Sequence, residues 1–187
     1  MSAGAVEAEV IDLLLLPERQ EEWPRPSRAY VRIDISLRMY WHNLFDICPA
    51  LLTLSGPDGM AIYRPFMRWA AEQDLSMGWQ FYLWVGQWLL QSTLRDQVTP
   101  ELLDTLMAAS AARWAVLDRS AAAGIVLGGV HSPAWTVGWK QRSVSGGREV
   151  ERWALAEPLP LPEGHFGYFL LSGPTLADFP GWLALPR

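Results

Sequence analysis

The clearest periodic pattern in the chain is the apolar run over residues 78–91. Its glutamines Gln80, Gln87 and Gln91 lie seven and four residues apart, so on a helix they share one narrow stripe. Nearly every other position is large and apolar, and a helix with so little polar surface is buried on most sides. The run is interrupted by glycine and glutamine and is shorter than the roughly 20 apolar residues that span a bilayer. We therefore predict a buried helix at the centre of a soluble core.

The first 27 residues are predicted to hold a helix and a loop. Residues 5–16 form a short helix with acidic residues near its N-terminal end, and Pro17 stops the pattern. Residues 17–27 are polar and contain further prolines, which makes helix unfavourable there.

Residues 30–42 fit two different periods. Apolar and polar residues alternate there as in a strand, but the apolar pattern also continues at helical spacing as far as Cys48. The length of the pattern favours a helix that begins at about Asp34, which can serve as its N-cap. Pro49 then breaks the helix, and residues 51–54 lead into a turn rich in glycine and proline.

Three further signals mark the beginnings of helices. Pro65 suits the first turn of a helix over residues 64–73, and Ser76 can cap the central helix. Residues 99–101 supply a threonine cap, a proline at the first helical position and an acidic first turn. The helix that follows has an apolar face made of Leu102, Leu103, Leu106 and Met107.

After residue 112 the pattern changes to short apolar or alternating runs that are split by glycine, proline and serine, as is typical of strands. The predicted strands are residues 114–117, 124–130, 135–140, 150–156 and 166–171, with a hairpin turn at 145–147. In the third of them, Trp135, Val137 and Trp139 share one face, and Thr136, Gly138 and Lys140 share the other. We expect the first face to be buried and the second to be solvated.

Together these elements predict an α+β fold, in which a helical N-terminal half packs on a C-terminal antiparallel β-sheet. A chain of 187 residues is long enough to form one core, so we expect a single domain over residues 1–187. Its parts are the N-terminal helix and loop (1–27), the helical part (28–112) and the β part (113–187).

The composition points to a protein partner. Half of the residues are hydrophobic and only 19% are charged, below the usual quarter, and there are 11 tryptophans, a residue type enriched at interfaces. The net charge of -5 argues against a nucleic-acid surface. The lone Cys48 cannot form an internal disulfide, and residues 1–16 lack the basic start of a signal peptide. We expect a cytoplasmic protein that binds no membrane.

No residue cluster in the sequence predicts catalysis. His42 and Asp46 lie four apart and would share a helix face, but a metal site needs a third ligand, and His131 and His165 have no spacing that supplies one. Cys48 lies on an apolar face and is expected to be a buried, inert thiol. The glycine-rich residues 124–129 lack the lysine and hydroxyl of a phosphate-binding loop. We therefore predict no catalytic residue, metal or cofactor in this chain.

Five short stretches carry a resemblance to a known family. They are RAYVRIDISLR at residues 28–38, LFDICPALL at 44–52, FYLW at 81–84, WLLQS at 88–92 and DFPGWL at 178–183. In these stretches the chain resembles the MbnC family of methanobactin biosynthesis proteins. The likeness covers residues 28–183 and contains no catalytic motif.

The resemblance implies a tight heterodimer with an MbnB-like oxygenase of TIM-barrel type, which holds the iron. It implies that the pair binds the leader of a ribosomal precursor peptide, MbnA-like and usually rich in lysine. Core cysteines of that peptide would become oxazolone and thioamide groups in a copper-binding product. The present chain would then be the non-catalytic subunit that recruits the leader.

An antiparallel sheet offers an edge to which an extended peptide can add as a strand. We expect the leader to pair with residues 114–118 or 124–130, because the first of these runs begins the predicted sheet. The expected contact residues are Trp114, Val116, Asp118, Ile125 and Leu127. Two alternatives remain open: an immunity or antitoxin-like protein that binds another protein, and a metal-dependent enzyme built on His42 and Asp46.

Overall fold

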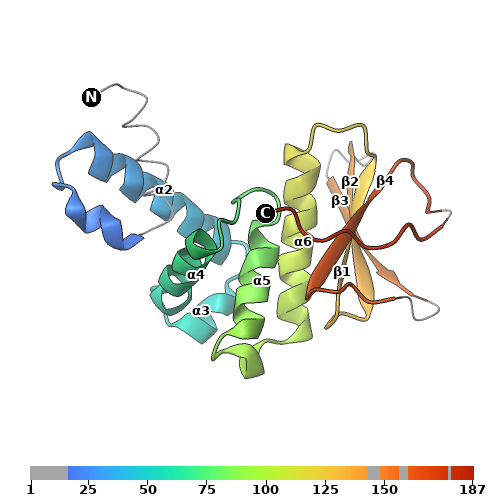
Figure 1. The fold of residues 1–187 in the computed structure, drawn as a ribbon, viewed down its shortest axis with the longest axis horizontal. Coiled ribbons are helices and arrows are strands. Elements are labelled where there is room, and N and C mark those ends of the chain that lie inside the picture. The colour runs from blue at the N-terminus through green and yellow to red at the C-terminus, as the bar shows by residue number, and fades with distance from the viewer. Residues whose placement is uncertain (1–16, 143–147, 156–159, 177) are drawn as a thin grey trace. The chain divides into compact units, whose positions relative to one another are not determined.

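The computed structural model describes residues 17–142, 148–155, 160–176 and 178–187. The helix predicted over residues 5–16 and the hairpin turn predicted at 145–147 lie outside these ranges. The chain divides into two compact units, Met1–Leu75 and Ser76–Arg187. The described part of the first is helical, and the second combines helices with a four-stranded antiparallel sheet (Figure 1). The predicted α+β class is confirmed.

The longest helix of the first unit is α2 (Arg28–Phe45), which confirms the helical interpretation of this stretch. It begins earlier than predicted because the Ser27 hydroxyl accepts a hydrogen bond from the Tyr30 N–H at 3.1 Å and so caps the helix. Asp34 was the expected cap, but it lies inside α2, where its carboxylate accepts a hydrogen bond from Arg38 at 2.8 Å.

Three shorter helices complete the described part of the first unit. They are η1 (Pro17–Glu22), α3 (Ala50–Ser55) and α4 (Met60–Glu72). The 3-10 helix η1 occupies part of the stretch predicted as a loop, so that prediction is wrong in part. Pro49 separates α2 from α3, as expected.

α4 begins four residues before the predicted start, so Pro65 lies inside the helix rather than in its first turn. The turn before α4 closes at Gly59, whose φ of 72° is left-handed. A Cβ at Gly59 would come within 2.5 Å of the Phe45 ring, so glycine is required there for two reasons. The Asp58 carboxylate accepts a hydrogen bond from the Met60 N–H at 3.0 Å and holds the first turn.

The helices of the first unit enclose an apolar core. Its largest fully buried side chains are Ile33, Leu44, Phe45, Leu51, Ile62, Phe66 and Met67. Cys48 is also buried, as predicted, and burial raises the pKa of its thiol. Because the thiolate is the reactive form, this environment disfavours chemistry at Cys48.

The second unit contains the predicted central helix, α5 (Phe81–Gln91), in which seven of eleven residues are buried. Burial on most sides is therefore confirmed. Gln80 is buried just before the helix, whereas Gln91 is exposed, so the polar stripe has no uniform environment. Ser76 does not cap α5, because its hydroxyl accepts from the Gln80 side chain, which also donates to the Pro186 carbonyl. No helix in the described ranges is long and apolar enough to cross a membrane.

The last helix, α6 (Pro100–Leu117), begins with the predicted cap, since the Thr99 hydroxyl accepts a hydrogen bond from the Leu102 N–H. It then runs further than predicted. Residues 114–117, expected to be a strand, form its last turn. The reason is that Ala111, Trp114 and Ala115 extend the same buried face at helical spacing, which a short apolar run alone does not reveal.

The sheet has the strand order β3-β2-β1-β4, and every neighbouring pair is antiparallel. The strands are β1 (Gly124–Gly129), β2 (Ala134–Arg142), β3 (Arg148–Ala154) and β4 (Phe166–Leu171). Four of the five predicted strands are thus confirmed. β1 lies inside the sheet, with β2 on one side and β4 on the other.

Both faces of the sheet are covered, so the expected solvated face is wrong. On one face, Ile125 and Leu127 pack in one cluster with Ala111 and Trp114 of α6, and Figure 1 shows α6 running along this side of the sheet. On the other face, Trp135 of β2 and Phe169 of β4 are core residues, and Phe179 and Trp182 of the C-terminal segment pack against them. The solvated-face prediction failed because α6 covers Thr136 and Gly138.

Replacing Trp84 should test the importance of α5 to the core. Its side chain is only 4% exposed, so we expect Trp84→Ala to lower the free energy of unfolding by about 3–5 kcal/mol, measured by urea denaturation. Trp84→Phe should cost less, about 1–2 kcal/mol, because it fills much of the space and removes an indole N–H that has no partner among the described residues. An unchanged denaturation midpoint in Trp84→Ala would contradict the buried position.

Candidate peptide-binding edge of the sheet

The five predicted contact residues do not form a strand edge. Trp114 is 2% exposed within α6, and Val116 projects from the same helix. Ile125 and Leu127 are fully buried in β1, whose two edges are already paired. Strand addition beside residues 114–118 or beside β1 is therefore not possible in this fold.

Asp118, the fifth of these residues, fixes the end of α6 instead. Its carboxylate lies 2.5 Å from the Lys140 ammonium group, which also donates to the Ser120 carbonyl and lies 4.9 Å from the centre of the Trp114 ring. Partial burial opposes ionisation of Asp118, but hydrogen bonds from Lys140 and Ser120 and the charge of Lys140 outweigh it and lower the pKa. These contacts join α6 to β2 and have a structural role.

The outer edge of β4 is partly occupied by the chain itself. Tyr168 donates its N–H to the Leu183 carbonyl at 3.1 Å and accepts a hydrogen bond from the Leu183 N–H at 2.8 Å. An added strand would have to displace this C-terminal segment.

The outer edge of β3 is the remaining one, and no strand in the described ranges pairs with it. Its orientation follows from a row of directly opposed residues, Tyr168, Leu127, Thr136 and Arg152. In an antiparallel sheet the N–H and C=O of one residue point to the same neighbouring strand. Two directly opposed residues therefore either point toward each other or point away from each other, and the two cases alternate from strand to strand along the row. Because Tyr168 points outward, Leu127 and Thr136 face each other, and the N–H and C=O of Arg152 point to the open edge.

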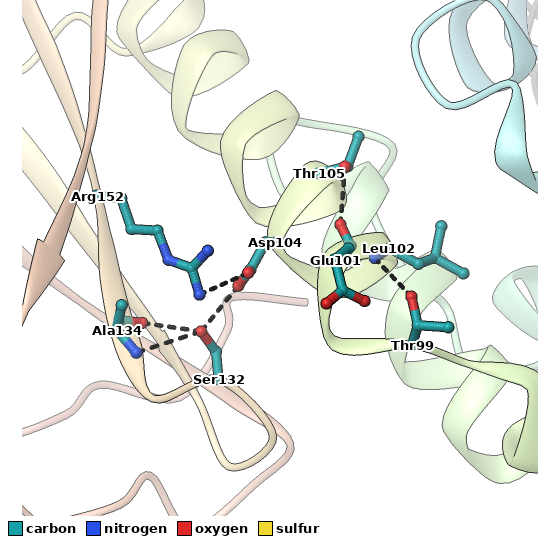
Figure 2. A network of polar contacts seen from close by, with 8 residues as sticks. All are labelled: Thr99, Glu101, Leu102, Asp104, Thr105, Ser132, Ala134 and Arg152. Carbon is teal, nitrogen blue, oxygen red and sulfur yellow. Dashed lines mark hydrogen bonds and ion pairs between the residues drawn. The ribbon is translucent and has the colours of Figure 1, made fainter.

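A polar network holds this edge against α6. The Arg152 guanidinium lies 2.7 Å from the Asp104 carboxylate, whose other oxygen lies 2.8 Å from the Ser132 hydroxyl (Figure 2). Ser132 also contacts the main chain of Ala134 at the start of β2. The Asp104 side chain is 16% exposed, so the network is partly shielded from solvent.

Carboxylates lie along both faces of the β3 edge. Glu101, in the first turn of α6, has its pKa lowered by hydrogen bonds from its own N–H and from Thr99, with a smaller effect from the charge of Arg152. On the opposite face, the exposed Glu151 accepts a hydrogen bond from the Trp153 indole at 2.8 Å. Asp104 and Glu101 thus lie on the same face as the Arg152 side chain, and Glu151 lies on the other; carboxylates on both faces suit a basic peptide.

Sequence reasoning did not select Asp104, Glu151 or Arg152. The alternation of residues 150–153 indicated a strand, but only the strand order makes it an edge. Asp104 belongs to a helix, and its distance from Arg152 along the chain gives no signal of pairing.

One of the three histidines pairs with an aspartate, and the other two stack on each other. His42 and Asp46 lie 3.2 Å apart on the exposed surface of α2, as their spacing predicted. His131 and His165, which the sequence did not connect, stack with ring centres 5.9 Å apart. Partial burial, followed by the charge of His131, lowers the pKa of His165. The described residues contain no group of three or more His, Cys, Asp or Glu that could hold a metal ion.

Removing the Lys140 ammonium should make the stability less dependent on acid pH. The pKa of Asp118 is lowered from 3.8 in the folded state, so its ionised form stabilises the fold above that pH and the contribution is lost as pH falls through the lowered value. We expect Lys140→Met to cost about 1–3 kcal/mol at pH 7 and progressively less below pH 3.8. Thermal unfolding over a pH series measures this, with Arg119→Met as the exposed control; a constant cost would contradict the ion pair.

A comparison with models of known protein families identifies the family of this chain. The model of the MbnC-like family, described as methanobactin biosynthesis cassette protein MbnC-like, matches residues 20–186. A search of curated proteins finds no match. Since the family match covers nearly the whole sequence, the chain belongs to the MbnC-like family and has a role in methanobactin biosynthesis.

Proposed function

We propose that this chain is the leader-binding, non-catalytic subunit of a heterodimeric iron-dependent oxygenase that modifies a precursor peptide. The observation that carries the proposal is the open edge of β3, with main-chain groups facing outward and carboxylates on both sides. An extended peptide gains main-chain hydrogen bonds at such an edge, and alternate side chains give it specificity. The family's place in methanobactin biosynthesis supplies the peptide as the expected guest.

The expected leader is rich in lysine, and this matches the charge around β3. Glu151 is exposed on one face, and Glu101 and Asp104 lie on the α6 side. Each exposed ion pair contributes only about 0–1 kcal/mol, so these charges would favour the correct register more than they raise affinity. Main-chain pairing and the Trp153 ring would provide most of the binding energy.

The oxidation itself is assigned to the partner. In this proposal the MbnB-like TIM-barrel subunit holds the iron, as the family resemblance implies. In this arrangement the present chain binds the leader, and the tethered core cysteine reaches the partner's site at a high effective concentration. The product would carry the oxazolone and thioamide groups that bind copper.

Proline at an outward-facing position should block strand addition. Ala154 lies two residues from Arg152, so its N–H also points to the open edge, and its side chain is exposed. Proline removes that donor but leaves the hydrogen bonds between β2 and β3 intact. We expect Ala154→Pro to weaken leader binding at least ten-fold, measured by fluorescence anisotropy with a labelled synthetic leader.

The matched control for this experiment is Ala154→Thr, which keeps the N–H and should bind within two-fold of the wild-type affinity. Circular dichroism establishes that both variants are folded. Wild-type affinity in a folded Ala154→Pro variant would rule out the β3 edge.

Reversing the charge of Glu151 should weaken leader binding in a salt-dependent way. A lysine at this exposed position would repel leader lysines, so we expect Glu151→Lys to lower affinity about three- to ten-fold at low salt and less at high salt. Glu72→Lys, on the exposed surface of the first unit, is the control for net charge. Equal effects of the two substitutions would show that only net charge matters.

A further inference from the structure

The face of β3 that lies away from α6 carries a tryptophan that pairs with another on the neighbouring strand. The ring centre of Trp153 on β3 is 6.0 Å from that of Trp139 on β2, and the two ring planes are 53° apart. Both rings pack against the core of this face, where Trp135 lies directly opposite Trp153 in the ladder. They are therefore held in position by the core, and each keeps part of its surface exposed to solvent beside the open edge.

A carboxylate lies next to these rings. Glu151 precedes Trp153 by two residues, so both side chains are on the same face of β3. The Glu151 carboxylate accepts a hydrogen bond from the Trp153 indole N–H at 2.8 Å, which fixes one oxygen and leaves the other able to accept a further bond. Among the side chains that the structure describes, no basic group lies within ion-pair distance of Glu151.

The cation nearest to Glu151 along the chain is on the opposite face of the strand. Arg152 projects to the α6 side, where its guanidinium lies 2.7 Å from the Asp104 carboxylate. The two faces of β3 therefore differ. One combines indole rings with an unpaired carboxylate, and the other places a guanidinium among carboxylates.

An antiparallel strand added at β3 would place every second side chain against the rings and the carboxylate. Because the main-chain groups of Arg152 point outward, the guest residues opposite Glu151 and Trp153 would form the closer, non-hydrogen-bonded pairs. Cβ atoms in directly opposed pairs lie about 4.5–5.5 Å apart. A guest lysine or arginine at either position can therefore reach the Glu151 carboxylate and lie within the roughly 6 Å of an indole centre that a cation–π contact needs.

We infer that Glu151, Trp153 and Trp139 form a subsite for basic side chains of a peptide strand bound at β3, and that this subsite recognises alternate residues of the peptide. The inference rests on the proposed function and adds a pattern to it. The guest carries lysine or arginine opposite Glu151 or Trp153 and a non-basic residue opposite Arg152, since like charges opposed across a ladder are destabilising. An apolar guest residue would contact the rings but would gain nothing from the carboxylate, and the experiment separates these two occupants.

The test compares lysine with norleucine, an uncharged side chain of similar length, at each position in turn of a synthetic leader. The leader is that of the precursor peptide encoded in the same gene cassette, and competition with the labelled leader, followed by fluorescence anisotropy, gives each affinity for the full-length chain. We expect lysine to bind at least about three-fold more tightly than norleucine at one position, or at two positions separated by one residue that lacks this preference. High salt should reduce the preference.

Glu151→Gln tests whether this carboxylate is the source of the preference. Glutamine can still accept the hydrogen bond from Trp153, so the substitution removes the charge while the ring stays in place. We expect the lysine and norleucine peptides to bind this variant within about two-fold of each other. Glu163→Gln, at an exposed position of the same unit, is the control for net charge and should keep the wild-type preference. Circular dichroism establishes that both variants are folded.

Three results would overturn the inference and leave the proposed function standing. They are equal binding of lysine and norleucine at every position, an equal preference for lysine at consecutive positions, and a preference that persists in the folded Glu151→Gln variant. Failure of the leader to bind the wild-type chain would overturn the proposed function, and this inference with it. Wild-type affinity in a folded Ala154→Pro variant would do the same.

Discussion

The close contact between α6 and β2 determines how the second unit is built. A Cβ on Gly138 would lie 2.7 Å from the Ala111 carbonyl oxygen and 2.9 Å from its Cβ, so only glycine allows the helix to lie against this strand. With α6 in this position, Ile125 and Leu127 are sealed beneath it. One face of the sheet is thereby removed from solvent. Because β1 and β2 are paired on both sides, unpaired main-chain groups of the sheet are restricted to the outer strands β3 and β4.

Local signals in the sequence predicted which helices form better than they predicted the residues at which those helices begin and end. The threonine, proline and glutamate at residues 99–101 located the start of α6, because capping depends on neighbouring residues. The end of that helix was missed because residues 114–117 are apolar in either structure, and only contact with the sheet selects the helix. α4 starts earlier than predicted for a similar reason: Gly59 closes its turn against the distant Phe45 ring.

The sequence suggested a kind of candidate site but not its position. Low charge and many aromatic residues indicated a protein partner, and the predicted antiparallel sheet offered an edge for strand addition. The choice of edge depended on strand order, which residues in β1 do not encode locally: Ile125 and Leu127 would look the same in an edge strand. The Asp104–Arg152 ion pair likewise depends on packing of α6 beside β3.

The two main-chain hydrogen bonds between Tyr168 and Leu183 affect where further strands can join the sheet. A sheet with two open edges can join copy after copy, since each added strand exposes a new edge. Here the chain's own C-terminal segment ends the ladder at β4, so growth is possible in one direction only. A strand added at β3 would itself expose a new edge, so the sheet can be extended on the β3 side, while the bridge at Leu183 hinders extension at β4.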